Sequence, residues 1–176
     1  SSFVYLATVI DLFTREIVGW SLRTRHNAEL VVSAMEEALQ KRKSPIFSHS
    51  DQGSENRSKA YIGLLTKNNI RISMSHKSSP WENPFQESFY SQFKLDLGNV
   101  FEFETLGKLI EEIGQKIRDY NEARIHPAFM MPPVEFRRKY EEERRKQDEN
   151  QQLILISDIQ RSIIKFSDFV YQKSCT

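Results

Sequence analysis

The sequence FVYLATVIDLFTREIVGWSL, residues 3–22, decides the fold class. Apolar and β-branched residues fill its two ends, residues 3–10 and 16–22, and a short polar connection, residues 11–15, joins them. Two such runs on either side of a short polar connection are typical of an antiparallel hairpin. We therefore expect this segment to form two paired strands near the start of a sheet.

Downstream of the hairpin, the chain alternates between helix and strand patterns. Apolar residues recur at helical spacing after Asn27, a suitable N-cap, and this helix should end before Pro45. Residues 46–50 (IFSHS) then predict a short strand, residues 59–67 a second helix and residues 70–75 a further strand. Strands followed by alternating helices and strands predict an α/β fold, with a mixed sheet flanked by helices.

A clear helix start follows the polar loop of residues 76–82. Asn83 suits the N-cap, Pro84 the first helical position, and Gln86 the third position of a capping box. A long amphipathic helix is expected next. Its apolar face should consist of Leu106, Leu109, Ile110, Ile113, Ile117 and Tyr120.

The last part of the chain is highly charged and then apolar. Residues 141–150 (EEERRKQDEN) predict a solvated helix end rather than a binding surface. Apolar residues within the tail, residues 147–176, favour a helix that covers part of the core, and a recombined C-terminus is the alternative. We expect a core domain over residues 1–138, followed by a charged helix and a tail without assignment over residues 139–176.

The composition limits the class of protein. With 176 residues, of which 39% are apolar and 28% charged, the chain can form one globular domain with appended structure. The 25 Lys and Arg residues against 24 Asp and Glu argue neither for nor against nucleic acid. The single cysteine, Cys175, excludes an intrachain disulfide framework and a cysteine-based zinc site. Without a secretory signal or about 20 consecutive apolar residues, we expect a cytoplasmic protein.

Two carboxylates are placed where they could carry chemistry. Asp51 follows directly on the strand of residues 46–50, and ligands gather at strand ends in open α/β sheets. Glu87 lies in the first turn of the helix that begins at residue 84, and Lys94 falls on the same face, opposite a stripe of phenylalanines. A pair of carboxylates brought together by the fold could bind Mg²⁺ for phosphodiester chemistry.

Each of these residues also has a structural interpretation. An aspartate before Gln-Gly is a common turn former, and a glutamate in a first helical turn interacts favourably with the helix dipole. A lone exposed lysine is usually only solvated, and lone histidines such as His49 and His76 are usually structural. No single residue therefore specifies a function.

These residues, taken together with their spacing and flanking sequences, indicate a function more specifically than any one of them does. HSDQGS (residues 49–54), the 35 residues between Asp51 and Glu87, and NPFQESFYSQFK (residues 83–94) together resemble the last two acids of the DDE motif. The resemblance is to insertion-sequence transposases that share the retroviral integrase core. YLATVIDLFTREIVGW near the start and YNEARIHPAFMMPPVEF, residues 120–136, also resemble that family.

The resemblance implies a ribonuclease-H-like fold and a site for two Mg²⁺ or Mn²⁺ ions, and the charged helix and tail add a C-terminal helical extension to that fold. The implied reaction is metal-dependent DNA cleavage followed by strand transfer, which serves transposition or integration. The implied partners are DNA, comprising transposon ends and target, further copies of the chain, and an upstream helix-turn-helix subunit. Asp51 and Glu87 match the catalytic metal ligands. The candidate DNA-binding residues are Asn83, Lys94, Lys77 and Arg124.

The chain also departs from the family pattern. The first aspartate of the motif belongs to a strand before residue 5, so we expect this fragment to be inactive alone, and Asp11 fits the hairpin turn better than a metal site. Asn56 stands where the family has an aromatic residue, and the loop SSPWENPF lacks the usual glycine. The alternative is a catalytically dead DNA-binding or assembly module. A nuclease acting on RNA–DNA hybrids is a third interpretation.

Overall fold

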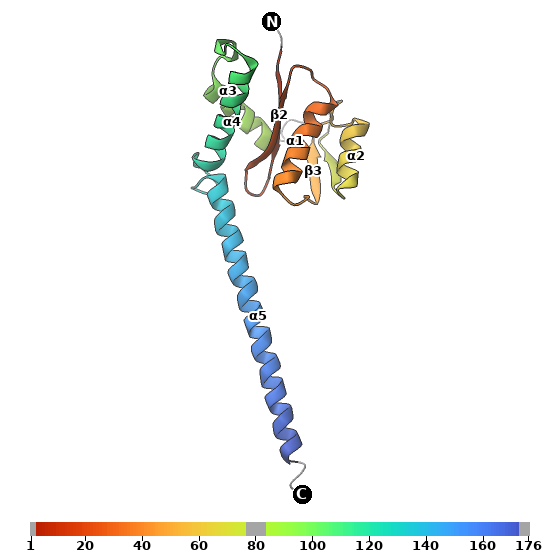
Figure 1. Cartoon of the computed structure of the whole chain (residues 1–176), viewed down its shortest axis with the longest axis vertical. Helices are drawn as coiled ribbons and strands as arrows, with labels where there is room; N and C mark the ends of the chain where they lie inside the picture. The colour runs from red at the N-terminus through yellow and green to blue at the C-terminus, as the bar shows by residue number, and fades with distance from the viewer. Residues whose placement is uncertain (1–2, 77–83, 173–176) are drawn as a thin grey trace. The chain divides into compact units, whose positions relative to one another are not determined.

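The computed structural model describes residues 3–76 and 84–172, and side chains within that part except those of residues 155 and 157–172. The chain divides into two units, Ser1–Val134 and Glu135–Thr176, which are described separately (Figure 1). In chain order the elements are β1 (Tyr5–Ile10), β2 (Ile17–Arg23), α1 (Ala28–Lys41), β3 (Phe47–Ser50), α2 (Lys59–Lys67), β4 (Arg71–Met74), α3 (Pro84–Leu97), the 3₁₀ helix η2 (Val100–Glu102), α4 (Leu106–Glu122) and α5 (Pro133–Gln172).

The predicted hairpin is confirmed, and it contains a β-bulge. β1 pairs antiparallel with β2, with Val9 opposite Gly19 and Ile10 opposite Ile17, so that Val18 is an extra residue in β2. A bulge shifts the alternation of side chains along one strand. As a result, Val18 and the next residue, Gly19, both face α1, whereas Ile17 packs into the core cluster on the other face of the hairpin.

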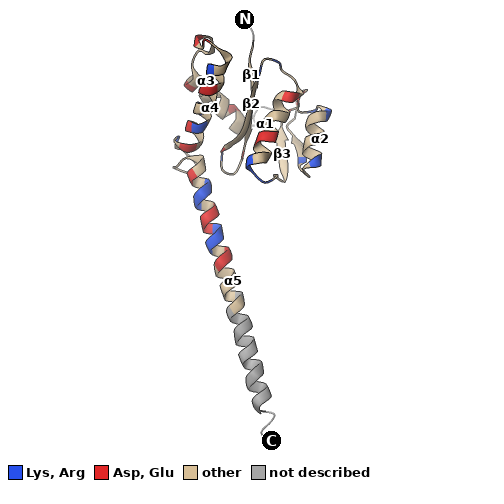
Figure 2. Ribbon diagram, viewed as in Figure 1, with Lys and Arg blue, Asp and Glu red and all other residues tan. Residues whose placement is uncertain are grey.

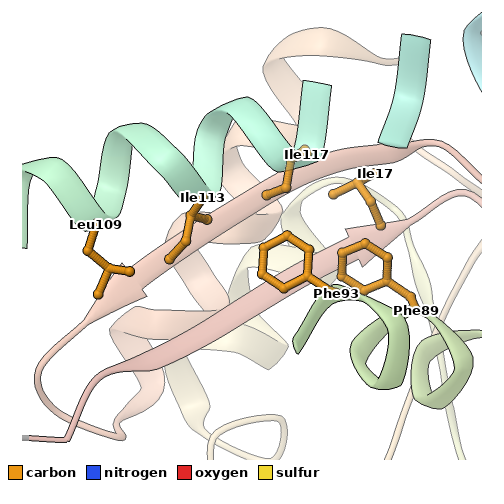
Figure 3. Close-up of a cluster of buried hydrophobic side chains, with 6 residues drawn as sticks. All are labelled: Ile17, Phe89, Phe93, Leu109, Ile113 and Ile117. Atoms are coloured by element: carbon orange, nitrogen blue, oxygen red, sulfur yellow. The ribbon is translucent and has the colours of Figure 1, made fainter. Parts of the chain in front are cut away.

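The hairpin separates two hydrophobic clusters, because helices cover both of its faces (Figure 1). On one side α3 and α4 pack against β2, and Figure 3 shows side chains from these three elements pointing toward one another. The members of this cluster are Ile17, Phe89, Phe93, Leu109, Ile113 and Ile117. On the other side, α1 and α2 pack with β3 and β4. The members of that cluster are Val18, Met35, Ala38, Tyr61, Leu65 and Ile70.

Gly19 allows the close approach of α1 to the hairpin. A Cβ atom at this position would lie 2.1 Å from the carbonyl oxygen of Ala34 and 2.7 Å from the amide nitrogen of Ala38. Only glycine lets two backbones come this near. The contact is reinforced by Glu37 of α1, whose carboxylate accepts a hydrogen bond of 2.6 Å from the amide of Trp20.

The predicted strand–helix–strand unit after residue 45 is also confirmed. β3 pairs in parallel with β4, with Phe47 opposite Arg71 and Ser50 opposite Met74. α2 connects them, and the Ser58 side chain caps it by accepting a hydrogen bond from the amide of Tyr61. In the described part of the chain the strands form two two-stranded sheets, β1–β2 and β3–β4. Antiparallel and parallel pairs with flanking helices give the expected mixed α/β architecture.

The predicted N-cap position of α1 is confirmed, but the Asn27 side chain does not make the capping bond expected of it. The backbone oxygen of Asn27 instead accepts from the amide of Leu30. α3 begins at Pro84 as expected, whereas Asn83 lies outside the described residues. The side-chain nitrogen of Gln86 donates to the backbone oxygen and the hydroxyl of Thr8 on β1, and the capping box with Asn83 stays a prediction.

The apolar face of α4 is narrower than predicted. Leu109, Ile113 and Ile117 are buried, and Gly114 beside them lets the ring of Trp20 approach the helix. Leu106 and Ile110, which the pattern placed on the same face, remain 45% and 39% exposed. Within the described residues, no helix combines the length and the apolar character that a membrane crossing requires.

α5 continues through the charge run that was predicted to be a solvated helix end. The run lies inside this 40-residue helix and is exposed, with acidic and basic side chains in succession along it (Figure 2). Side chains four residues apart pair along the helix. The pairs are Glu135–Lys139, Arg137–Glu141, Glu142–Lys146 and Arg145–Glu149. A helix that is polar all round depends on such pairs rather than on packing.

Candidate metal and DNA site

Asp51 lies at the carboxyl end of β3, directly after Ser50, and it is exposed. Its Oδ1 atom accepts two hydrogen bonds, from the amide of Gly53 at 2.9 Å and from the side-chain amide of Asn56 at 2.9 Å. Both hydrogen bonds that the Asp51 side chain makes with described residues therefore end on one oxygen. Oδ2 has no hydrogen-bond partner among the described residues.

The loop that carries Asp51 is anchored on two sides. The Gln52 side chain donates to the backbone oxygen of Ser75 at the end of β4, 3.2 Å away. Glu55 is only 7% exposed, and its Oε1 lies 2.5 Å from Nδ1 of His26. A Cβ atom on Gly53 would lie 2.7 Å from Oε2 of Glu55 and 3.0 Å from Oδ1 of Asp51, so a larger residue there would displace these carboxylates. These contacts fix the position of the Asp51 carboxylate relative to β3.

Glu87 is exposed in the first turn of α3, and its neighbours anchor that turn to the hairpin. Gln86 and Tyr90 both reach β1: Gln86 bonds Thr8, and the Tyr90 hydroxyl donates to the backbone oxygen of Leu6 at 3.1 Å. Burial raises the pKa of Tyr90, so this hydroxyl stays protonated and keeps its donor at neutral pH. The face of α3 that packs on β1 therefore leaves Glu87 directed outward.

The two candidate metal ligands come from different parts of the fold, Asp51 from the end of β3 and Glu87 from the first turn of α3, and do not contact each other directly. Among the described residues, His, Cys, Asp and Glu side chains form no group of three or more that could hold a metal ion. The donor chemistry nevertheless fits a hard cation, since Asp51 and Glu87 both offer exposed carboxylate oxygens. Mg²⁺ usually takes one or two protein carboxylates and completes its shell with water and phosphate.

The candidate DNA-binding residues differ in their surroundings. Lys94 is exposed on α3, two turns after Glu87. Arg124 follows α4 and forms an ion pair with Asp96 of α3, with 2.9 Å between Nη1 and Oδ2. This pair links the two helices and gives Arg124 a supporting role in the fold. Lys77 and Asn83 lie outside the described residues.

His126 occupies a tight turn after α4. Its Nδ1 atom accepts a hydrogen bond of 3.2 Å from the amide of Ala128, and its ring lies beside Phe129 with centroids 5.0 Å apart. Burial lowers the pKa of His126, and the positive charges of Arg15 and Arg124 lower it further. A neutral imidazole is consistent with the accepted hydrogen bond, because a protonated Nδ1 could not accept it.

The sequence did not single out two residues that support α3 and α4. Arg15 stacks its guanidinium on the Phe85 ring, 3.3 Å from the centroid, while its backbone adopts a φ of 63°. Asn121 of α4 bonds both backbone groups of Ile17. A basic residue in a hairpin turn and an asparagine near a helix end are weak signals, because neither shows which distant residue will be its partner.

Comparisons with known proteins show the family and the fold of the chain. Two models described as "Integrase core domain" match residues 1–80 and 68–133. The integrase chain of a simian T-cell lymphotropic virus intasome, in complex with a PP2A regulatory subunit, has a TM-score of 0.65 at 15% identity, covering 73% of this chain and 46% of that one. The HTLV-2 integrase catalytic core in complex with magnesium, in a trimeric form, has a TM-score of 0.52 at 15% identity, covering 76% and 90%. The chain shares the ribonuclease-H-like fold of integrase catalytic cores.

Relatives found by sequence similarity define the class of protein more closely. The transposase of insertion sequence element IS904 from Lactococcus lactis subsp. lactis (strain IL1403) is 38% identical over 126 residues, which are 70% of this chain and 50% of that protein. The chain belongs to the integrase core family and is a member of its insertion-sequence DDE transposases. It spans about half the length of this relative.

Proposed function

We propose that the chain supplies the catalytic core for DNA transposition in the bacterial cytoplasm, through metal-dependent phosphodiester cleavage and strand transfer. The observation that supports this most is the exposed Asp51 carboxylate, which is fixed through Oδ1 at the end of β3 and has no described partner on Oδ2. Glu87 offers a second exposed carboxylate on α3. The relationship to the IS904 transposase gives the substrate class, DNA.

In this proposal Asp51 and Glu87 hold Mg²⁺ or Mn²⁺. The bound metal would supply positive charge to the oxygens of the phosphodiester, in the two-metal arrangement expected of the complete protein. Asn56 and the amide of Gly53 orient the Asp51 carboxylate. Gln86 and Tyr90 hold α3 on β1 and so fix the position of Glu87, while the ammonium of Lys94 binds a DNA phosphate.

Partners and domain limits are part of the proposal. The HTLV-2 integrase core, which shares the fold, is known in trimeric and dimeric forms in complex with magnesium. We propose that this chain also works as an oligomer, because two DNA ends must be held together. An upstream helix-turn-helix subunit and DNA contacts of Lys77, Asn83 and Arg124 belong to the same proposal. So do a core over residues 1–138 and a separate extension over residues 139–176.

We further propose that the chain alone has little or no cleavage activity. The proposed site has two carboxylates, and the described residues add no third His, Cys, Asp or Glu close enough to complete a metal-binding group. A two-metal site needs more ligands than two carboxylates supply without substrate. A direct test should therefore measure metal and DNA binding rather than turnover.

The test is fluorescence anisotropy of a labelled DNA duplex, titrated with the chain in low salt, with and without Mg²⁺. We expect binding that Mg²⁺ strengthens, a loss of this strengthening in Glu87→Gln, and a uniformly weaker affinity with a salt slope lower by about one in Lys94→Gln. Lys67→Gln, at the end of α2, is the matched control for a lost lysine. Binding that is steeply salt-dependent but indifferent to Mg²⁺ and to Glu87→Gln would favour the catalytically dead module. Absence of binding would contradict both.

A further inference from the structure

Asn56 occupies the position where the family resemblance leads one to expect an aromatic residue, and its side chain bonds the candidate metal ligand. Its Nδ2 donates to Oδ1 of Asp51 at 2.9 Å. The amide of Gly53 donates to the same oxygen at 2.9 Å. Two donors on one oxygen of an exposed carboxylate are more than a turn-forming aspartate needs, since the bond to the residue two positions on already forms the turn.

The backbone around Asn56 fixes the direction of its side chain. The amide of Arg57 donates to the oxygen of Gly53 at 3.2 Å, and the amide of Ser58 donates to the oxygen of Glu55 at 3.2 Å. Glu55 is itself buried and paired with His26. The Asn56 side chain therefore starts from a constrained backbone and is half-buried. Little rotamer entropy remains to be lost when it bonds Asp51.

Because Oδ1 accepts two hydrogen bonds, the direction of Oδ2 is restricted as well. Hydrogen bonds from two N–H groups in different directions hold the carboxylate in one orientation, and bonds to a charged acceptor are stronger than those between neutral groups. Oδ2 then points in one direction and binds a cation through a single oxygen. An aromatic side chain at position 56 carries no N–H group as close to its Cβ as the amide of asparagine. It therefore could not donate a hydrogen bond to Oδ1 in this way.

We propose that Asn56 is a positioning residue for Asp51: it holds Oδ1 so that Oδ2 is the metal-facing oxygen. The inference rests on the proposed function, in which Asp51 is a metal ligand. It assigns a positioning role to a residue that departs from the family pattern. Residues that orient metal ligands in this way typically change metal affinity by 10- to 100-fold when they are removed.

The first measurement does not involve metal. Side-chain three-bond couplings of Asp51 in the metal-free chain report its χ1 distribution by NMR. We expect one rotamer in the wild type, averaging over two or more in Asn56→Ala, and one rotamer in the control Asn68→Ala. Asn68 is a matched control because it also loses one side-chain hydrogen bond, that to the oxygen of Leu64, in the neighbouring helix α2. Unchanged couplings in Asn56→Ala would overturn the inference.

The second measurement is the Mn²⁺ affinity, from paramagnetic broadening of the Gln52 and Gly53 amide signals. We expect about tenfold weaker binding in Asn56→Ala and no change in Asn68→Ala. An averaged Asp51 rotamer with unaltered Mn²⁺ affinity would show that the orientation does not serve the metal, and would overturn the role assigned to Asn56. Broadening unaffected by Glu87→Gln and by Asp51→Asn would instead contradict the proposed function, while the metal-free couplings would still decide whether Asn56 holds Asp51.

Discussion

The side-chain amide of Asn121 holds both backbone groups of Ile17. Its Oδ1 accepts from the Ile17 amide at 2.8 Å, and its Nδ2 donates to the Ile17 carbonyl at 2.9 Å. The two residues are 104 positions apart in the chain, and Ile17 is 3% exposed. The Asn121 amide thus satisfies both backbone groups at the start of β2, as a neighbouring strand would. It also fixes α4 on the hairpin, against which α3 packs as well.

Removal of this amide should destabilise the core unit. In Asn121→Ala both backbone groups of Ile17 lose their partner, and an unsatisfied buried group costs about 1–3 kcal/mol. We expect the free energy of unfolding, measured by urea denaturation, to fall by about 2 kcal/mol. Asn121→Asp keeps the acceptor but places a carboxylate against the carbonyl of Ile17, so it should be at least as destabilising. Wild-type stability in both variants would show that the contact contributes nothing.

Two glycine-to-alanine substitutions should act in opposite directions. A Cβ at Gly19 would lie 2.1 Å from the oxygen of Ala34, so α1 must move away from β2. Overpacking of this kind costs about 1–3 kcal/mol or more. Gly63 in α2 has nothing within 4 Å of the added Cβ, and Gly63→Ala should raise stability by about 0.5–1 kcal/mol through helix propensity. A Gly19→Ala protein as stable as the wild type would contradict the close packing of α1 and β2.

The stacking of Arg15 on Phe85 should be measurable as a coupling energy. A planar guanidinium 3.3 Å from the ring centroid interacts with the ring face, which the ammonium of lysine does less well. Thermal or urea unfolding of Arg15→Lys, Phe85→Leu and the double variant forms a double-mutant cycle. We expect a coupling of about 1 kcal/mol. Strictly additive effects would mean that the hairpin turn does not hold the first turn of α3 through this contact.

The stability of the core unit should fall on acidification through His126. Burial, Arg15 and Arg124 lower the pKa of His126 in the folded state. The unfolded chain therefore binds a proton first, so the stabilising contribution is complete above the unfolded pKa of about 6.5 and is lost as the pH falls through the folded pKa. His126→Asn retains an acceptor for the amide of Ala128 but does not titrate. Between pH 7 and pH 5, the Tm of the wild type should fall more than that of His126→Asn, and parallel curves would refute this assignment.

Local sequence patterns predicted the elements well where local interactions determine them. The hairpin followed from apolar runs around a polar turn, and α2 begins and ends at the predicted residues 59 and 67 because Ser58 caps it and its apolar face packs. The placement of Asp51 after β3 and of Glu87 in the first turn of α3 followed in the same way. Their roles as metal ligands remain predictions.

Interactions between distant residues decided what the sequence could not predict. The spacing of Gln86 predicted only a local capping box, which stays a prediction, and it could not show that Thr8, 78 positions away, offers the side-chain nitrogen of Gln86 two acceptors on β1. Asn56 suggested drift from the family pattern, whereas in the folded loop it bonds Asp51. The side chains of Asn121 and Arg15 likewise acquire their partners only when the hairpin meets α3 and α4. In each case a polar side chain has a choice of partners that only the tertiary fold determines.

Anomalous scattering from crystals soaked in millimolar Mn²⁺, with the wild-type chain compared with Glu87→Gln, tests the central claim most directly. The account predicts a peak next to Oδ2 of Asp51 and the carboxylate of Glu87 in the wild type, and its loss in the variant. A peak that persists in Glu87→Gln, or no peak near Asp51 at saturating Mn²⁺, would contradict a metal site shared by these two residues.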